Sequence, residues 1–350
     1  MNTKIGVGLI GFGNSAKNFH APLIRAETEY DLKKVLRSSD NPLPDNFSDC
    51  SLANNMEEIL TDSSIDLVII TTPNHIHYDQ AVESLKAKKH VVVEKPFTVT
   101  SEQADRLIEI SKSADKVLTV YQNRRWDGDF LTIKQLLNDK PLGEPVEFES
   151  TFNRFRNYFK ENAWKEKPLP GSGILYDLGP HLLDQALQLC GEPNELYADI
   201  RAQREGDADD YFEIDLYYPS FKAKLKAGML VPDKTPRFVL RCKNGAYVKY
   251  GFDPQESDLS TGKNPGSSNW GKEEEKNWGT IYRWDGENVV TKKIKTKAGN
   301  YPQFYKQLKS AILSNGKPPV DPSDAKNVIS LIELAKKSSA EGKRLRVKSL

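Results

Sequence analysis

The segment IGVGLIGFGNSA, residues 5–16, joins a short apolar run to a glycine-rich turn with the spacing G-x-G-x-x-A. In a strand–turn–helix unit, Gly11 permits a tight turn, Gly13 lets the backbone approach a pyrophosphate, and Ala16 allows close helix–strand packing. The N-terminus of the following helix offers N–H groups and a positive dipole end to the phosphates. The segment therefore predicts a dinucleotide-binding turn, and the alternative is a glycine turn without a ligand. The residues expected to contact the dinucleotide here are Gly11, Phe12, Gly13, Asn14 and Ser15.

Short apolar runs alternate with helix-like segments over the first 120 residues. We expect strands at 5–10, 32–36, 67–71, 90–93 and 117–120, and helices at 19–27, 56–60, 78–86 and 101–114. Nearly continuous apolar strands separated by helices indicate a parallel sheet that is covered on both faces. The chain is therefore predicted to begin with a nucleotide-binding α/β domain over residues 1–122.

Longer strands with alternating polarity follow residue 145 and predict a second domain over residues 123–350. A turn at Pro219-Ser220 would pair the strands 211–218 and 221–227, with Asp215 opposite Lys224 and Glu213 opposite Lys226. This pattern indicates a largely antiparallel sheet with one face packed on helices. We expect a long surface excursion at 253–277 and helices at 302–314 and 322–339.

The composition argues against several classes of protein. The 350 residues include 50 Lys and Arg against 49 Asp and Glu, which gives no bulk charge for binding nucleic acid or an anionic membrane. The sequence shows no signal peptide and no apolar run near the roughly 20 residues of a membrane span. Cys50, Cys190 and Cys242 are far apart, and His75 and His77 lack a third ligand at a suitable spacing. We therefore expect a cytoplasmic protein without a bound metal.

The end of the second strand bears on the choice between NAD and NADP. An NAD site favours a carboxylate there for the ribose 2′-hydroxyl, whereas this chain has Arg37, Ser38 and Ser39. A guanidinium and hydroxyls suit a 2′-phosphate, so we expect NADP, with NAD still possible because Asp40 lies close by. The alternative is a solvated arginine at a strand end.

Three further segments carry polar groups suited to chemistry. Thr71–His77 and Glu94–Pro96 follow parallel strands, at the sheet edge where open α/β folds bind ligands. Gly171–Asp184 contains Asp177 and His181 at a spacing that places them on one face of a helix. The residues of the first two segments expected near the cofactor are Thr72, Pro73, Asn74, His77, Glu94 and Lys95.

These groups fit the oxidation of an alcohol. An imidazole such as His181, with an ordinary pKa near ~6.5, can take a hydroxyl proton at neutral pH. Lys95 can stabilise alkoxide character on the reacting oxygen, and Asp177 can orient the histidine. The alternatives are a strand-end lysine and an ion pair on a helix surface.

The chain resembles the glucose–fructose oxidoreductase / inositol dehydrogenase / MocA family along nearly its whole length. The resemblance is carried by GFGNSA (11–16), TTPNHIH (71–77), EKP (94–96) and DLGPHLLD (177–184). Within the family, FHAPLI (19–24), YQNRRWDGDF (121–130) and YFEIDLYY (211–218) are similar to NADP-dependent scyllo-inositol dehydrogenases. Gly171-Ser172-Gly173 departs mildly from the three glycines of many members.

The resemblance implies a Rossmann domain followed by an α/β domain with an open sheet, commonly used for homodimer or homotetramer contacts. It implies that Lys95 is catalytic, that His181 is the proton acceptor, and that Asp177 is the orienting partner of His181. It also places Asn74 and His77 at the nicotinamide end of the cofactor groove. The expected reaction interconverts a secondary alcohol and a ketone on a cyclic polyol or sugar.

Several residues remain open between roles. Asn123 and Arg124 are candidates for the cofactor, although Arg124 and Arg125 are also read as a surface pair, and Asn153, Arg154 and Trp164 are candidates for the substrate. Three alternative functions are another sugar or aldose dehydrogenase, a hydrolase that uses nicotinamide transiently, and an NADP-binding sensor without turnover. The sensor predicts loss of a catalytic residue, whereas Lys95, Asp177 and His181 are all present.

Overall fold

The computed structural model describes residues 4–38, 43, 47, 49–161, 163–348 and 350. The chain forms two compact units, and neither is one continuous segment. The first unit comprises residues 1–123, 255–270 and 300–326, and the second comprises 124–254, 271–299 and 327–350. The predicted division after residue 122 assumed two continuous domains, whereas two later segments return to the first unit.

The first unit contains a six-stranded sheet with the order β3-β2-β1-β4-β5-β6, in which every pairing is parallel. The order reverses between β1 and β4, and such a switch point is where open α/β sheets bind ligands. This is the predicted Rossmann-like arrangement. The strands are β1 (Ile5–Ile10), β2 (Tyr30–Leu36), β3 (Ser51–Ala53), β4 (Leu67–Ile70), β5 (His90–Val93) and β6 (Leu118–Val120).

The helices predicted for the first unit are found with one clear difference in bounds, and the structure adds η3 and α7. Helical structure begins at Asn14, directly after the glycine turn, five residues before the predicted start at Phe19. The polar run from Asn14 to Asn18 shows no apolar period, although it starts the helix that presents N–H groups at the turn. The helices are η1 (Ala16–His20, a π-helix), α1 (Ala21–Ala26), α2 (Glu57–Leu60), η3 (Asn74–Ile76), α3 (His77–Lys86), α4 (Ser101–Ala114), α7 (Gln255–Ser260) and α8 (Pro302–Ser314).

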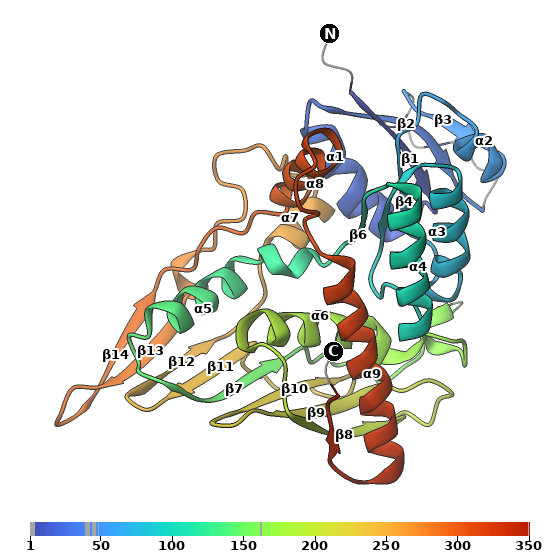
Figure 1. Cartoon of the computed structure of the whole chain (residues 1–350). Helices are drawn as coiled ribbons and strands as arrows, with labels where there is room; N and C mark the ends of the chain where they lie inside the picture. The colour runs from blue at the N-terminus through green and yellow to red at the C-terminus, as the bar shows by residue number, and fades with distance from the viewer. Residues whose placement is uncertain (1–3, 39–42, 44–46, 48, 162, 349) are drawn as a thin grey trace. The chain divides into compact units, whose positions relative to one another are not determined.

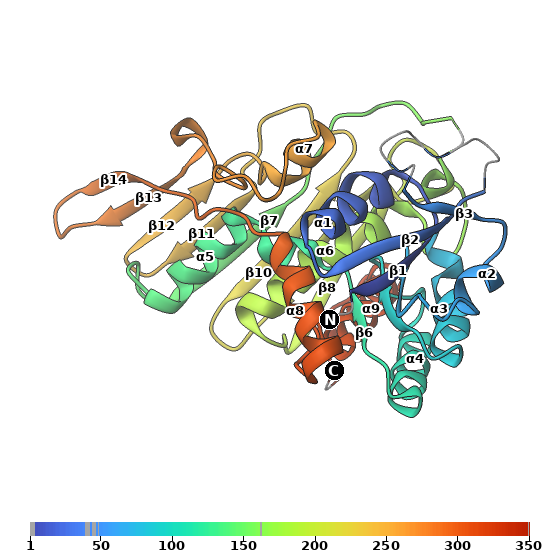
Figure 2. The same cartoon turned by 90° about the horizontal axis from the view of Figure 1, so that it is seen from above.

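The second unit contains a nine-stranded sheet with the order β14-β13-β12-β11-β7-β10-β9-β8-β15. All of its pairings are antiparallel except that of β7 with β10. Helices α5 and α6 lie on the same face of this sheet (Figures 1 and 2). The predicted open, mostly antiparallel sheet with a helical cover is confirmed.

The bounds of the remaining elements complete the fold. The strands are β7 (Pro145–Thr151), β8 (Glu195–Arg201), β9 (Tyr211–Tyr217), β10 (Lys222–Gly228), β11 (Phe238–Cys242), β12 (Gly245–Lys249), β13 (Gly279–Trp284), β14 (Val289–Ile294) and β15 (Leu345–Arg346). The helices are η4 (Asn123–Trp126), α5 (Gly128–Asp139), η5 (Trp164–Glu166), α6 (Gly173–Cys190), η6 (Glu275–Asn277) and α9 (Pro322–Glu341).

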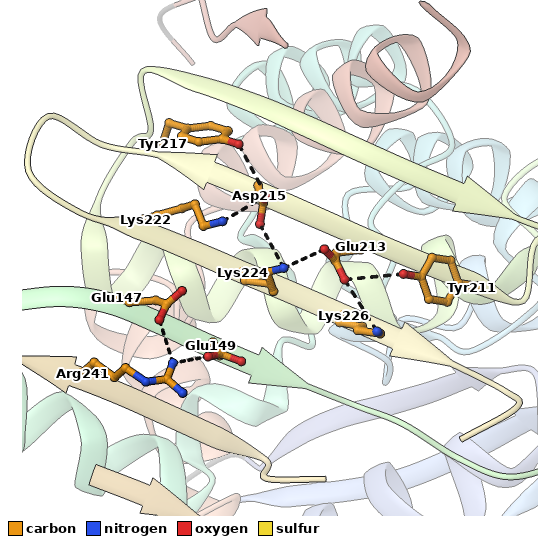
Figure 3. Close-up of polar contacts among 10 residues, drawn as sticks. All are labelled: Glu147, Glu149, Tyr211, Glu213, Asp215, Tyr217, Lys222, Lys224, Lys226 and Arg241. Carbon is orange, nitrogen blue, oxygen red and sulfur yellow. Dashed lines mark hydrogen bonds and ion pairs between the residues drawn. The ribbon is translucent and has the colours of Figure 1, made fainter. Parts of the chain in front are cut away.

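The hairpin β9–β10 has the predicted register, with Asp215 opposite Lys224 and Glu213 opposite Lys226. The ion pairs on its polar face also run diagonally (Figure 3). The Lys224 ammonium lies 2.7 Å from Glu213 and 4.0 Å from Asp215, while Lys222 lies 3.2 Å from Asp215. Apolar residues fill the opposite face, so charge and burial specify the same register. Those buried residues are Phe212, Ile214, Leu216, Ala223, Leu225 and Ala227.

The predicted surface excursion at 253–277 is largely exposed, but its first part is anchored in the first unit. Residues 255–270 belong to the first unit, where Gln255 is fully buried and Trp270 is 7% exposed. The Gln255 carbonyl oxygen accepts from the indole N–H of Trp270 at 2.9 Å and from the backbone N–H of Tyr301 at 2.7 Å. Composition hid this, because many Gly, Ser and charged residues surround a few anchors.

Candidate active site

The glycine turn leaves β1 at the switch point and has the features that a dinucleotide needs. Gly11 has φ of +92°, and a Cβ there would lie 2.9–3.0 Å from atoms of Thr71. At Gly13 the added Cβ would meet no described atom within 4 Å beyond its chain neighbours. Glycine is therefore required sterically at the first position and keeps the second open for a ligand. Ala16 is fully buried, as close helix–strand packing requires.

Two cationic side chains lie near the ring of Phe12, the residue between these glycines. Phe12 is buried edge-on against Phe47, with ring centroids 5.0 Å apart. The Arg37 guanidinium lies 5.9 Å from the Phe12 ring centroid, and the Lys17 ammonium lies 5.3 Å from it. Arg37 therefore reaches the turn from the end of β2. Ser38 is exposed, whereas Ser39 and Asp40 lie outside the described residues.

Lys17 is a candidate cofactor-binding residue that the sequence patterns did not identify. Because the helix begins earlier than the apolar pattern indicates, the ammonium of Lys17, like the guanidinium of Arg37, lies close to the Phe12 ring.

His77 links the segments that follow β4 and β5. Its imidazole is fully buried, with Nε2 at 2.9 Å from the Thr72 carbonyl and Nδ1 at 2.9 Å from the Pro96 carbonyl. Burial lowers the pKa of His77, although the two carbonyls oppose this change. The side chain is thus held between backbone groups, and its neighbours Thr72, Pro73 and Asn74 form the rest of this segment.

Glu94 and Lys95 follow β5 directly. The Glu94 carboxylate accepts the Ser15 hydroxyl from the glycine turn, the Lys95 backbone N–H at 2.9 Å and an imidazole nitrogen of His20 at 3.1 Å. Burial raises the pKa of Glu94, but these bonds and the nearby positive charges outweigh burial and lower it to about 2. Glu94 is therefore an ionised anchor. Lys95 is half-buried, and its peptide bond to Pro96 is cis.

In the second unit, helix α6 carries Asp177 and His181 one turn apart, as predicted. Its start depends on Gly173, whose φ is +84° and whose added Cβ would lie 2.2 Å from the Asp209 carboxylate. Asp209 accepts the backbone N–H of Leu175 at 2.7 Å and so caps the helix. Burial raises the pKa of Asp209 to about 6, although these backbone bonds oppose the change.

The environments of the two α6 residues differ. His181 is 5% exposed, whereas the Asp177 side chain is 19% exposed and lies 2.5 Å from the Lys165 ammonium. Lys165 also lies 5.7 Å from the ring centroid of Trp164, which is half-buried. Sequence analysis missed Lys165, for which adjacency to Trp164 is the only signal in the sequence.

The surface-pair reading of Arg124 and Arg125 is wrong. Arg125 binds the buried Asp184 carboxylate through two nitrogens, at 2.9 and 2.6 Å. Arg124 is 7% exposed and lies 3.2 Å from Asp127. Asn123, the last residue of the first unit's N-terminal segment, is 6% exposed.

Asn153 lines a cavity of about 210 Å³ that lies within the second unit. Its amide nitrogen donates to the Thr235 hydroxyl at 3.2 Å, whereas its buried Oδ1 has no hydrogen-bond partner among the described residues. Arg154 is exposed, and its guanidinium lies 5.2 Å from the Phe152 ring centroid. A carbonyl oxygen that lacks a donor and belongs to a residue lining a cavity fits a ligand that carries hydroxyl groups. The remaining lining residues are Thr151, Asp233, Lys234, Arg237, Gly251 and Phe252.

The described residues include neither a candidate metal site nor a candidate membrane span. No group of three or more His, Cys, Asp or Glu side chains among them could hold a metal ion. Within the same residues, no helix has the length and hydropathy needed to cross a membrane.

A parallel sheet with a glycine turn at its switch point is the arrangement of dinucleotide-binding proteins. The family described as the oxidoreductase family with an NAD-binding Rossmann fold matches residues 5–122, and its C-terminal alpha/beta domain matches residues 134–348. The chain belongs to this Gfo/Idh/MocA oxidoreductase family. It is an NAD(P)-dependent dehydrogenase that acts on a small molecule.

Relatives match along nearly the whole chain. An oxidoreductase of Escherichia coli, YdgJ, is 41% identical over 97% of this chain and 97% of its own length. The scyllo-inositol 2-dehydrogenase (NADP(+)) IolW of Bacillus subtilis is 37% identical over 96% of this chain and 94% of its own length. The solved structure of the oxidoreductase yvaA from Bacillus subtilis has a TM-score of 0.95 at 35% identity, and the match covers 99% of each chain.

Proposed function

We propose that this protein is an NADP-dependent dehydrogenase that interconverts a secondary alcohol and a ketone on a cyclic polyol, with scyllo-inositol as the favoured substrate. The observation that carries the proposal is the arrangement of Lys95, whose backbone is fixed through Glu94 to the glycine turn. The substrate class is supported by the 37% identity to a relative named scyllo-inositol 2-dehydrogenase (NADP(+)).

The proposed chemistry divides between three side chains. His181 takes the proton of the hydroxyl group, and Lys95 donates a hydrogen bond to the oxygen as alkoxide character develops. Asp177 orients His181 and is itself held by Lys165. A bound nicotinamide would supply the acceptor or donor of the hydride. We infer that Asn74, Asn123 and Arg124 line the cofactor, that His77 supports the adjoining segments, and that Asn153, Arg154 and Trp164 face the substrate.

The proposal is tested by measuring NADPH formation with a panel of inositols, glycosides and aldoses. Turnover of scyllo-inositol, or reduction of its keto form, at the highest kcat/KM is the expected result. Preferential oxidation of a glycoside would favour another sugar dehydrogenase, because a D-glucoside 3-dehydrogenase of Escherichia coli is 27% identical over 55% of this chain. NADP binding without turnover of any compound would contradict the proposal and favour a sensor.

We also propose that Arg37 selects NADP by binding its 2′-phosphate. Arg37→Ala removes a charge-assisted hydrogen bond, so the Kd for NADP should rise by roughly 10- to 100-fold while the Kd for NAD changes little. Both constants can be measured by fluorescence titration with the reduced cofactors. Arg25→Ala is the matched control, since Arg25 stacks on Phe47 beside the same ring pair but binds Asp49. An equal loss for both cofactors would refute the assignment.

We further propose a homodimer or homotetramer formed through the open face of the nine-stranded sheet. That face carries opposite charges on neighbouring strands, and Arg241 on β11 contacts both Glu147 and Glu149 on β7 (Figure 3). A second copy can meet such a surface with opposite charges. Light scattering at low and high salt tests this, and a monomer at micromolar concentration in low salt would contradict it.

A further inference from the structure

In the first unit, a series of buried hydrogen bonds ends at the Glu94 carboxylate. The Tyr305 hydroxyl lies 2.6 Å from Nδ1 of His20, and Nε2 of His20 lies 3.1 Å from the Glu94 carboxylate. His20 and Tyr305 are both fully buried. Tyr305 comes from α8, within the segment 300–326 that returns to this unit. These hydrogen bonds therefore connect α8 to Glu94, the residue next to Lys95.

The partners define the direction of each bond. Burial raises the pKa of Tyr305 well above its usual range, so its hydroxyl keeps its proton and can donate. The Glu94 carboxylate is ionised and can only accept. Nε2 of His20 must then donate to Glu94, and a neutral imidazole with its proton on Nε2 can accept the Tyr305 hydroxyl at Nδ1. Both ring nitrogens are thus used, and His20 fixes the orientation of Glu94.

Glu94 passes this constraint to two parts of the cofactor site. One oxygen of its carboxylate accepts the Ser15 hydroxyl of the glycine turn and the His20 bond, and the other accepts the Lys95 backbone N–H at 2.9 Å. Rotation of the carboxylate would release the Lys95 backbone from the turn. Because small errors in the position of a reacting group cost large factors in rate, a side chain that fixes Glu94 acts on the chemistry of Lys95.

We propose that His20 is a positioning residue for Lys95, held in one orientation by Tyr305 and acting through Glu94. The inference rests on the proposed catalytic role of Lys95 and extends it to a hydrogen-bond chain that starts on α8. It predicts a larger effect on kcat than on cofactor affinity, since neither His20 nor Tyr305 needs to touch the cofactor.

The test compares four variants of the full-length protein. His20→Ala should lower kcat by about tenfold or more while the KM for substrate and the Kd for NADPH stay within about threefold. His20→Gln keeps a donor at the place of Nε2 and should recover much of this loss, and Tyr305→Phe should give an intermediate loss. Tyr30→Phe is the matched control. It removes another buried hydroxyl that donates to the Tyr305 carbonyl at 2.7 Å, and it should lower thermal stability without lowering kcat.

A second readout needs no turnover. Hydrogen exchange of the peptide that contains the Lys95 amide should be faster in His20→Ala than in the native protein and in Tyr30→Phe. If the native protein oxidises no polyol, the proposed function fails, and this measurement still decides the role of His20. The inference is overturned if exchange at Lys95 is unchanged in His20→Ala, or if Tyr30→Phe lowers kcat as much as His20→Ala. Should His20→Ala not fold, the comparison of His20→Gln, Tyr305→Phe and Tyr30→Phe decides between the same outcomes.

Discussion

Replacement of Lys95 by methionine is expected to lower kcat by about 10²-fold or more while the Kd for NADPH stays within about threefold. Methionine keeps the length of the side chain but cannot donate a hydrogen bond to the reacting oxygen or offset its negative charge. The Lys95 backbone is held by Glu94 and the Pro96 carbonyl by His77, so the loss should reflect the ammonium group alone. Steady-state kinetics and NADPH titration measure the two quantities.

Lys89→Met provides the matched control at the opposite end of the same strand. Lys89 immediately precedes β5, is 7% exposed, and donates to the backbone carbonyls of Asp62 and Ile65 at 2.8 and 2.7 Å. Its loss should lower the urea concentration at the midpoint of unfolding but leave kcat close to the native value. The role of Lys95 is refuted if Lys95→Met turns over substrate at the native rate, or if both variants lose activity in proportion to stability.

The parts of the fold that were predictable depend on local patterns. Strands β1 and β5 and helices α4 and α8 have the predicted bounds, because apolar runs and their polar limits encode them directly. The β9–β10 register was predictable because charge and burial on one hairpin require the same pairing. Strand β3 was missed, since its three residues at the sheet edge, two of them exposed, form no apolar run.

Contacts between distant segments were not predictable in the same way. Gln255 carries no local sign that its carbonyl oxygen binds both Trp270 and Tyr301. Tyr305 likewise lies 285 residues from His20, and a buried tyrosine on an amphipathic helix is indistinguishable in sequence from ordinary core.

In the candidate site, too, local motifs were predictable and contacts between distant segments were not. Short motifs located the glycine turn, the Glu94-Lys95 pair and the α6 residues. The supporting contacts, such as Lys165 with Asp177 and Asp209 with the start of α6, depend on tertiary placement that no motif records.

His181→Ala is expected to lower kcat by about 10²-fold or more, because the hydroxyl proton then loses its acceptor in the step that transfers hydride. Cofactor affinity should be spared, since the proposed role of His181 is a contact with the substrate hydroxyl and not with the cofactor. With polyol deuterated at the reacting carbon, the isotope effect on kcat should increase, as the chemical step becomes rate-limiting.

The control for His181→Ala is His75→Gln, which alters an exposed histidine and should change neither kcat nor the isotope effect. Lys165→Met separates the proposed proton acceptance by His181 from the proposed orienting role of Asp177. If Asp177 acts only by orienting His181, loss of its ammonium partner should reduce kcat less than His181→Ala does. A His181→Ala variant with native kcat would exclude His181 as the proton acceptor and would require another group to take the hydroxyl proton.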